Sequence, residues 1–158
     1  MTILRIISNQ RELDLSTTQV MGILNITYDS FSDGGKYITP SAAIDHAANM
    51  VNAGAKIIDI GGESTRPGAN IINDHEEAER VIPIIASLVQ RFDVLISVDT
   101  SKALVIRESA AVGVHLINDV RALSQPGAIE AAAMTNLPIC IMHMQGEPLT
   151  MQNKPFYH

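Results

Sequence analysis

The residues from Asp59 to Asn70 combine the side chains that an anion-binding loop needs. Their sequence is Asp-Ile-Gly-Gly-Glu-Ser-Thr-Arg-Pro-Gly-Ala-Asn, and it follows the short apolar run 56–58. Two adjacent glycines allow a sharp turn or a close approach to a ligand, and a carboxylate, two hydroxyls and one guanidinium come next. Hydroxyls and an arginine on a loop that leaves a strand suit an anionic group such as phosphate. The alternative is a solvated loop with an ordinary surface arginine.

Polar residues also stand where the other apolar runs of the chain end. They are Asn25, Asp99, Asn118 and His143, and Asp59 ends a fifth run in the same way. The carboxyl ends of the strands in a β/α barrel converge on one rim, where the active site forms. The sequence therefore predicts a polar site at one end of a parallel sheet.

Five apolar runs alternate with amphipathic helical patterns, which is typical of a parallel sheet covered by helices. The predicted strands span residues 20–25, 56–60, 94–99, 114–118 and 139–142, and the predicted helices begin near residues 40, 74, 101 and 126. Residues 3–8 and 12–15 predict a small hairpin or an irregular lead-in.

Several helix details follow from local chemistry. Thr39 before Pro40 predicts the start of the first helix. Asp74 with a glutamate three residues later resembles a capping box, and Glu76, Glu77 and Glu79 predict a solvated face of the second helix. Ser101 is expected to cap the third helix. Pro83 lies inside the second apolar stripe and predicts a kink or two abutting helices.

The fold class is therefore α/β, and we favour a (β/α)8 TIM barrel over a doubly wound sheet. There is no Gly-x-Gly-x-x-Gly after the first strand and no Walker-type lysine motif, which disfavours nucleotide-binding folds. Eight βα units typically need about 250 residues, and this chain supplies roughly the first four and a half. We expect residues 1–158 to be a single domain that is incomplete at its C-terminus, or one that pairs with another copy. Such a half barrel leaves an open parallel edge and an uncovered inner face.

Composition excludes several classes of partner. The net charge is −6 with 11 scattered basic residues, whereas nucleic-acid binding needs a clustered basic face. We therefore expect no nucleic acid, and no membrane, because no segment approaches the roughly 20 apolar residues of a span. Cys140 is the only cysteine and lies in an apolar run, where a buried thiol is expected. Without an internal disulfide, a reducing, cytoplasmic location is expected.

Five segments resemble those of dihydropteroate synthases, most closely the bacterial enzymes. The segments 21–35 (MGILNITYDSFSDGG) and 58–68 (IDIGGESTRPG) resemble the two signatures of that family, and SVDTSK at 97–102, IND at 117–119 and MHMQG at 142–146 continue in family order. The resemblance implies a (β/α)8 barrel enzyme of folate biosynthesis, a transferase that uses Mg2+. Such an enzyme condenses 6-hydroxymethyl-7,8-dihydropterin diphosphate with p-aminobenzoate to give 7,8-dihydropteroate and pyrophosphate, and sulfonamides mimic p-aminobenzoate.

The resemblance assigns roles to three residues at the ends of predicted strands. Asn25 would ligate Mg2+ through its side-chain oxygen, because Mg2+ prefers oxygen donors and substrate phosphates. Asp99 and Asn118 would hydrogen-bond the pterin ring, because a carboxylate accepts hydrogen bonds from its N–H groups, while an amide can both accept and donate. The alternatives are structural: Asn25 would finish a strand, Asp99 would cap the following helix and Asn118 would lie in a turn.

The resemblance assigns five more residues to the two long loops. Thr65 and Arg66 would contact the diphosphate or shape the loop around it, and Arg66 would help to stabilise the charge of the leaving group. Phe31 and Pro67 would form the walls for the p-aminobenzoate ring, although Phe31 has plain packing as its alternative. Asp33 would stabilise the cationic methylene carbon once its loop closes.

The chain also departs from the family pattern. Tyr28 stands where the family usually has proline, which removes rigidity from the first loop. A further pterin-binding aspartate, a lysine and an Arg-x-His pair belong to a C-terminal half that this sequence does not contain, so we expect little or no turnover from this chain alone. The family tends to form homodimers. Two alternatives remain: a pterin-binding methyltransferase domain and a non-catalytic remnant.

Overall fold

A five-stranded parallel sheet organises the chain. The computed structural model describes residues 4–26, 39–63, 72–146, 150–152 and 154–157. The strands are β3 (Met21–Asn25), β4 (Ile57–Gly61), β5 (Leu95–Asp99), β6 (Leu116–Asp119) and β7 (Ile139–Ile141), and they are neighbours in chain order. Every pairing between them is parallel. A sheet whose strands follow chain order is built like part of a barrel, because a doubly wound sheet reverses its order at a switch point.

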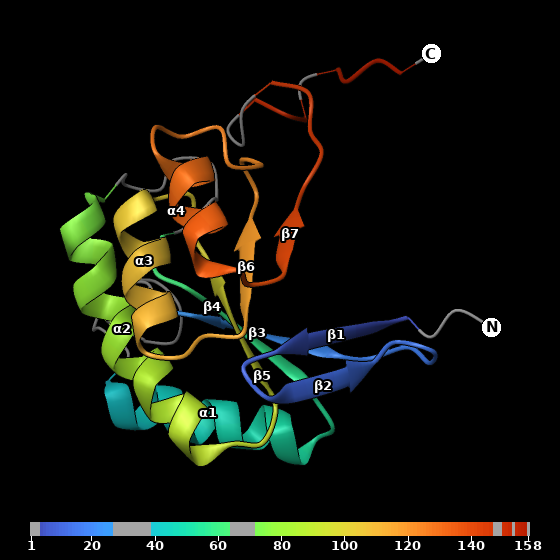
Figure 1. Ribbon diagram of the computed structural model, residues 1–158, viewed down its shortest axis with the longest axis vertical. Coiled ribbons are helices and arrows are strands. Elements are labelled where there is room, and N and C mark those ends of the chain that lie inside the picture. Colours follow the sequence, from blue (N-terminus) through green and yellow to red (C-terminus); the bar gives the residue numbers. More distant parts are fainter. Residues whose placement is uncertain (1–3, 27–38, 64–71, 147–149, 153, 158) are drawn as a thin grey trace.

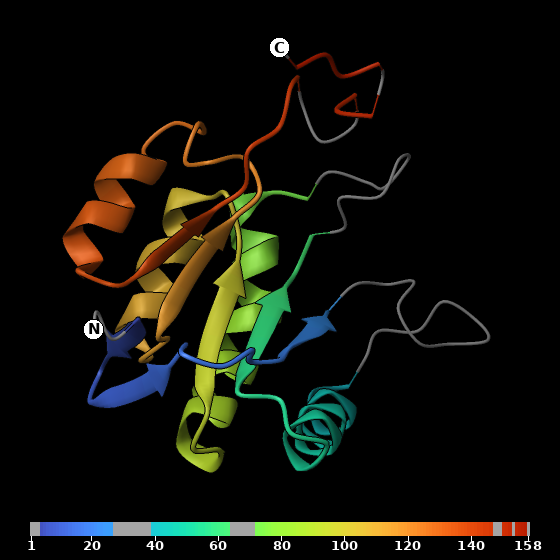
Figure 2. The ribbon, with the colours of Figure 1, turned by 90° about the vertical axis from the view of Figure 1, so that its right-hand side faces the viewer.

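Four helices connect these strands and lie against one face of the sheet (Figures 1 and 2). They are α1 (Pro40–Asn52), α2 (Asp74–Arg91), α3 (Ala103–Ala111) and α4 (Ala128–Thr135). The main core lies between the sheet and this helical layer, and fully buried Leu24, Ile58, Ile96 and Val98 supply its sheet side. A smaller cluster joins Ile117 of β6 to the alanines of α4.

The other face of the sheet is only partly covered. Ile23 of β3 is 51% exposed, and Ile139 and Ile141 of β7 are 42% and 58% exposed. The expected open edge and uncovered inner face are therefore confirmed for the described residues. Cys140, between the two exposed isoleucines, is also exposed, so the expectation that its thiol is buried is wrong, because β7 is an edge strand.

The predicted lead-in hairpin is confirmed as β1 (Arg5–Ser8) paired antiparallel with β2 (Arg11–Asp14). It lies at the amino ends of the parallel strands (Figure 1). Arg11 donates hydrogen bonds to the carbonyls of Val94 and, at 3.1 Å, Val89, and Asn9 donates to the carbonyl of Val114 at 2.7 Å. The hairpin is thus hydrogen-bonded to the residues that precede β5 and β6.

Buried His115 makes a further hydrogen bond near the amino ends of the strands. Its Nδ1 accepts a hydrogen bond from the backbone N–H of Ile96 at 3.0 Å, so that nitrogen carries no proton. Burial lowers the pKa of His115 to about 4, and the nearby charge of Arg11 contributes to the decrease. The imidazole is therefore neutral in the folded protein at neutral pH.

The helix starts refine the sequence expectations. Thr39 caps α1 as predicted, with its hydroxyl accepting from the N–H of Ala42. The cap of α2 is Asn73 rather than Asp74, since the Asn73 oxygen accepts from the N–H of Glu76. The structure has one continuous α2 around Pro83 instead of two abutting helices. None of the described helices is long and apolar enough to cross a membrane.

Candidate functional site

Three polar residues and one glycine form a row across the carboxyl ends of four adjacent strands. The strand register pairs Asn25 with Gly61, Gly61 with Asp99 and Asp99 with Asn118, so these four residues occupy one level of the sheet. We call them the rim row. A Cβ atom built on Gly61 would lie 3.4 Å from Oδ1 of Asn25 and 3.7 Å from Oδ2 of Asp99. The two side chains therefore flank the gap that Gly61 leaves, and the rim row presents oxygen atoms on one side of the sheet.

Asp59 lies one level deeper than the rim row. It pairs with Ile23 and Ser97 in the middle of β4, so the prediction that it ends a strand is wrong by two residues. Its side chain is buried, and Nδ2 of Asn118 donates a 2.9 Å hydrogen bond to its Oδ2. Burial raises the pKa of Asp59, while the nearby Ser97 hydroxyl and Asn118 amide oppose the increase.

Asp99 is the titratable residue of the rim row, and its pKa is shifted. Burial raises its pKa to about 7. The carboxylates of Asp59, Asp119 and Glu77 add to this rise in pKa. The guanidinium of Arg121 opposes it. A carboxyl group with a pKa near neutrality accepts N–H hydrogen bonds in its ionised form, so a ligand that donates N–H groups shifts it towards that form. Asp99 is therefore suited to bind N–H groups of a ligand.

A charged cluster lies behind Asp99 and consists of Glu63, Glu77, Lys102 and Arg121. Lys102 Nζ is 2.6 Å from Oε2 of Glu63 and 2.7 Å from Oε2 of Glu77, and it also donates to the carbonyl of Ile72 at 2.6 Å. Burial lowers the pKa of Lys102, but its bonds to the two glutamates outweigh that effect and raise it. Arg121 completes the cluster at 3.3 Å from Glu63.

The charged cluster was not predicted from the sequence, and Glu77 contradicts an explicit expectation. Its side chain is buried, whereas the sequence predicted a solvated helix face. The missed signal is spacing: Glu77 precedes the buried residues Val81 and Ile85 by four and eight positions, which places all three on one helix face. Lys102 ends the SVDTSK segment, whose sequence alone does not relate it to Glu77.

Ser101 and Asp119 form a structural link beside the cluster. The Ser101 hydroxyl donates to Oδ1 of Asp119, and Asp119 Oδ2 accepts from the N–H of Leu123 at 2.8 Å. Lys102, not Ser101, occupies the N-cap position of α3 and makes no side-chain cap bond, so the predicted cap is wrong. Asp119 is fully buried and holds the turn after β6.

The structure thus brings together three of the predicted site residues: Asn25, Asp99 and Asn118. The other five lie outside the described residues, and their predicted roles stay predictions; they are Phe31, Asp33, Thr65, Arg66 and Pro67. Tyr28 also lies outside the described part. No group of three or more histidine, cysteine, aspartate or glutamate side chains suited to a metal occurs among the described residues.

A parallel sheet whose strands follow chain order, with polar residues at their carboxyl ends, belongs to the β/α barrel class, in which that end of the sheet forms the binding site. The family model for pterin binding enzymes matches residues 21–158. The chain belongs to this family.

Its relatives include dihydropteroate synthases. The chain is 60% identical to the dihydropteroate synthase of Escherichia coli K12 over 154 residues, which are 98% of this chain and 55% of that enzyme. The structure matches the Yersinia pestis dihydropteroate synthase in a sulfonamide drug complex with a TM-score of 0.90 and 58% identity, covering 98% of this chain and 56% of that chain. It matches the Xanthomonas albilineans enzyme with 4-aminobenzoic acid with a TM-score of 0.84 and 48% identity, covering 90% of this chain and 53% of that chain. The chain thus spans about half the length of these relatives.

Proposed function

We propose that this chain forms part of a dihydropteroate synthase site. The reaction would join 6-hydroxymethyl-7,8-dihydropterin diphosphate to p-aminobenzoate, and its products would be 7,8-dihydropteroate and pyrophosphate. One observation carries the proposal: the strand register places Asp99 beside Asn118 on adjacent strands at the carboxyl end of the sheet. High identity to named dihydropteroate synthases over 98% of the chain supports the reaction class. In this proposal, residues 1–158 belong to a single pterin-binding domain.

The rim row would recognise the pterin ring. The edge of an aminopyrimidinone ring offers several N–H donors, and an ionised carboxylate only accepts hydrogen bonds. Asp99 would therefore accept from the ring, and Asn118 beside it would supply a second polar contact. Because burial raises the pKa of Asp99 to about 7, and the ligand favours the ionised form, pterin affinity should rise as the pH increases through 7.

Asn25 would supply the protein ligand to Mg2+. Its Oδ1 borders the gap above Gly61 on the same level as Asp99, and an amide oxygen is a donor that Mg2+ accepts. One protein oxygen is sufficient for this ion, because Mg2+ commonly keeps several waters and binds substrate phosphates. When bound, Mg2+ would neutralise charge on the diphosphate.

The chemical step needs no protein nucleophile. The C–O bond between the pterin methylene carbon and the diphosphate breaks, and pyrophosphate leaves with the bonding electrons. The amine nitrogen of p-aminobenzoate then forms a bond to that carbon and loses a proton. We propose the predicted roles for the five loop residues: diphosphate contacts from Thr65 and Arg66, ring walls from Phe31 and Pro67, and stabilisation of the cationic carbon by Asp33.

The family resemblance further suggests that the protein forms a homodimer. A cytoplasmic location agrees with a single cysteine, since a chain with one thiol forms no internal disulfide.

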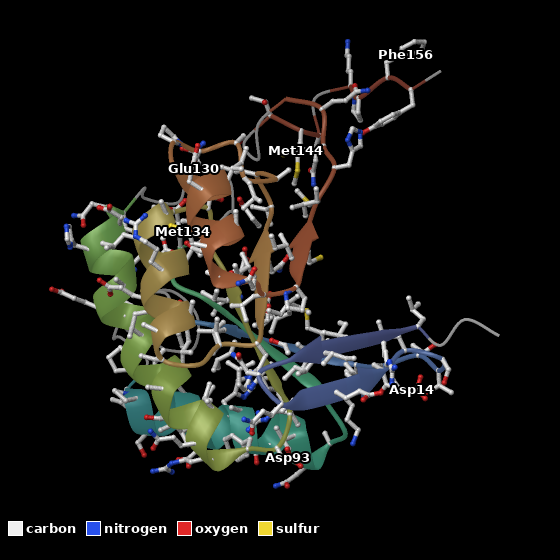
Figure 3. All side chains as sticks on the ribbon, viewed as in Figure 1. Asp14, Asp93, Glu130, Met134, Met144 and Phe156 are labelled. Carbon is white, nitrogen blue, oxygen red and sulfur yellow. The ribbon has the colours of Figure 1, made fainter. Side chains whose placement is uncertain are left out.

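Binding of 6-hydroxymethylpterin to this chain tests the proposal. We expect measurable affinity by isothermal titration calorimetry, and a loss of roughly ten-fold or more in Asp99→Asn, since a hydrogen bond to a charged group contributes about 1.5–3 kcal/mol. The matched control is Asp93→Asn, because Asp93 precedes β5 just as Asp99 ends it. Figure 3 shows Asp93 at the opposite end of the molecule from Met144, which follows β7.

Two outcomes would contradict the proposal. Equal affinity in Asp99→Asn and Asp93→Asn would remove Asp99 from the pterin site. Transfer of a methyl group from a methylated pterin to a corrinoid would assign the chain to a methyltransferase. Dihydropteroate formation with p-aminobenzoate, Mg2+ and the pterin diphosphate would establish the reaction itself.

A further inference from the structure

Asp59 is the buried carboxylate below the proposed pterin site. It is 3% exposed, and it lies one level below Asp99 in the middle of β4. Its Oδ2 accepts the hydrogen bond from Nδ2 of Asn118 at 2.9 Å. Its Oδ1 has no hydrogen-bond partner within the described part of the chain. A buried carboxylate with so few partners is costly, which indicates that it serves a purpose other than packing.

The chemistry of this bond fixes the orientation of the Asn118 side chain. A side-chain amide has a donor end and an acceptor end, and nothing in its shape distinguishes them. An ionised carboxylate only accepts, so Asp59 selects the orientation in which the amide nitrogen faces it. The carbonyl oxygen of Asn118 then points away from Asp59, and no described residue donates a side-chain hydrogen bond to it.

We propose that Asp59 is a positioning residue that holds the Asn118 amide with its oxygen towards the pterin and so makes Asn118 a hydrogen-bond acceptor. This inference rests on the proposed function. It means that Asp99 and Asn118, adjacent on the rim row, both present acceptors to the ligand. The site then matches a ring edge with neighbouring N–H groups and disfavours an edge that presents an oxygen there.

Pterin and lumazine are suitable probes for this preference. The two bicyclic rings have similar size, but lumazine has an oxo group where pterin has the 2-amino group. A fixed acceptor at Asn118 favours the amino compound, and a freely rotating amide accommodates either. The ratio of the two dissociation constants therefore reports the orientation of the amide.

Asp59→Asn is the informative variant. It keeps the size and shape of the side chain, but an amide at position 59 either accepts from or donates to Asn118, so it no longer selects one orientation. The matched control is Ser97→Ala, which removes a buried hydroxyl from the neighbouring position of β5 and leaves the carboxylate in place. We expect the preference for pterin over lumazine to fall roughly three- to ten-fold in Asp59→Asn and to be unchanged in Ser97→Ala.

Nuclear magnetic resonance of the 15N-labelled free chain tests the orientation without any ligand. In the parent chain and in Ser97→Ala, one Asn118 side-chain proton should resonate downfield and exchange slowly with water, because it is bonded to the carboxylate. Asp59→Asn should lose both properties. Assignment of the signal comes from its disappearance in Asn118→Ser.

The two measurements separate this inference from the proposed function. Unchanged ligand preference in Asp59→Asn, or a rapidly exchanging Asn118 amide in the parent chain, would overturn the positioning role. Failure of the parent chain to bind either ring would overturn the proposed function and the ligand part of this inference. A protected Asn118 amide in that case would still establish that Asp59 fixes the orientation.

Discussion

Replacing Lys102 with methionine should destabilise the fold strongly, since this one ammonium group serves three acceptors. The contacts are 2.6 Å to Glu63, 2.7 Å to Glu77 and 2.6 Å to the carbonyl of Ile72. Methionine keeps most of the length and apolar volume of the lysine side chain, so packing changes little. What changes is the charge facing two glutamates.

The exposure of each partner sets the size of the effect. The Glu77 side chain is 2% exposed and the Glu63 side chain 12%, whereas Lys102 is 20% exposed. Removing one partner of a buried ion pair typically costs 3–5 kcal/mol, because the remaining charge is left in a poorly solvated place. Because Lys102 is partly exposed, we expect the low end of this range, a loss of about 3 kcal/mol in the free energy of unfolding. A chain of this length should then melt roughly 6–12 °C lower.

Urea unfolding monitored by circular dichroism measures this loss. Lys102→Met combined with Glu77→Met should regain part of the lost stability, because the double variant removes the most buried uncompensated charge. Lys56→Met is the matched control, since Lys56 is an exposed residue just before β4, and it should change stability by less than about 0.5 kcal/mol. If Lys102→Met unfolds at the urea concentration of the parent chain, the charged cluster does not stabilise the protein.

Three further predictions concern neighbouring glycines and two titrating groups. Gly62→Ala should cost about 1–3 kcal/mol, because its Cβ would lie 2.8 Å from Val81 Cγ1; Gly61→Ala, with 3.4 Å as its closest contact, should be nearly neutral in the same thermal melts. The pKa of His115 is lowered to about 4, so its contribution to stability is complete above pH 6.5 and is lost as the pH falls towards 4; His115→Gln should flatten this part of the stability profile, and an unchanged slope would refute the assignment. The pKa of Asp99 is raised to about 7, so between about pH 4 and 7 the folded state holds a proton on Asp99 that the unfolded state has lost. The stability that this proton contributes is lost as the pH rises through 7. In Asp99→Asn, stability should therefore increase more steeply with pH over that interval than in the parent chain.

The arrangement of strands and helices was predictable because each apolar run is long enough to show its period. Thr39 with Pro40 marked the start of α1 correctly, since that cap uses only neighbouring residues. The level of Asp59 in the sheet was not predictable, because strand register depends on the partner strand, and a shift of two residues keeps the same face. The sequence thus predicted that Asp99 and Asn118 lie at the ends of strands, whereas the hydrogen bond that joins Asn118 to Asp59 could be found only from the fold.

Ion pairs between residues far apart in the chain were also not predictable from the sequence. Glu77 and Lys102 are separated by most of α2 and all of β5, and no local pattern relates them. The same holds for Glu63, whose partner Lys102 lies after the next strand. A buried glutamate on an apolar stripe indicates that a cation lies nearby, but its identity depends on how α3 packs against α2.

The hairpin at the amino ends of the strands has a consequence for the order of folding. Residues 9 and 11 bind the carbonyls of Val89, Val94 and Val114, which follow them by 78 to 105 positions. These acceptors are in place only after α2, β5, α3 and β6 have assembled. The hairpin is therefore among the last segments to dock, because closing so long a loop before its binding surface exists is entropically costly. Until then β1 and β2 pair only with each other, and an isolated two-stranded hairpin is marginally stable in water.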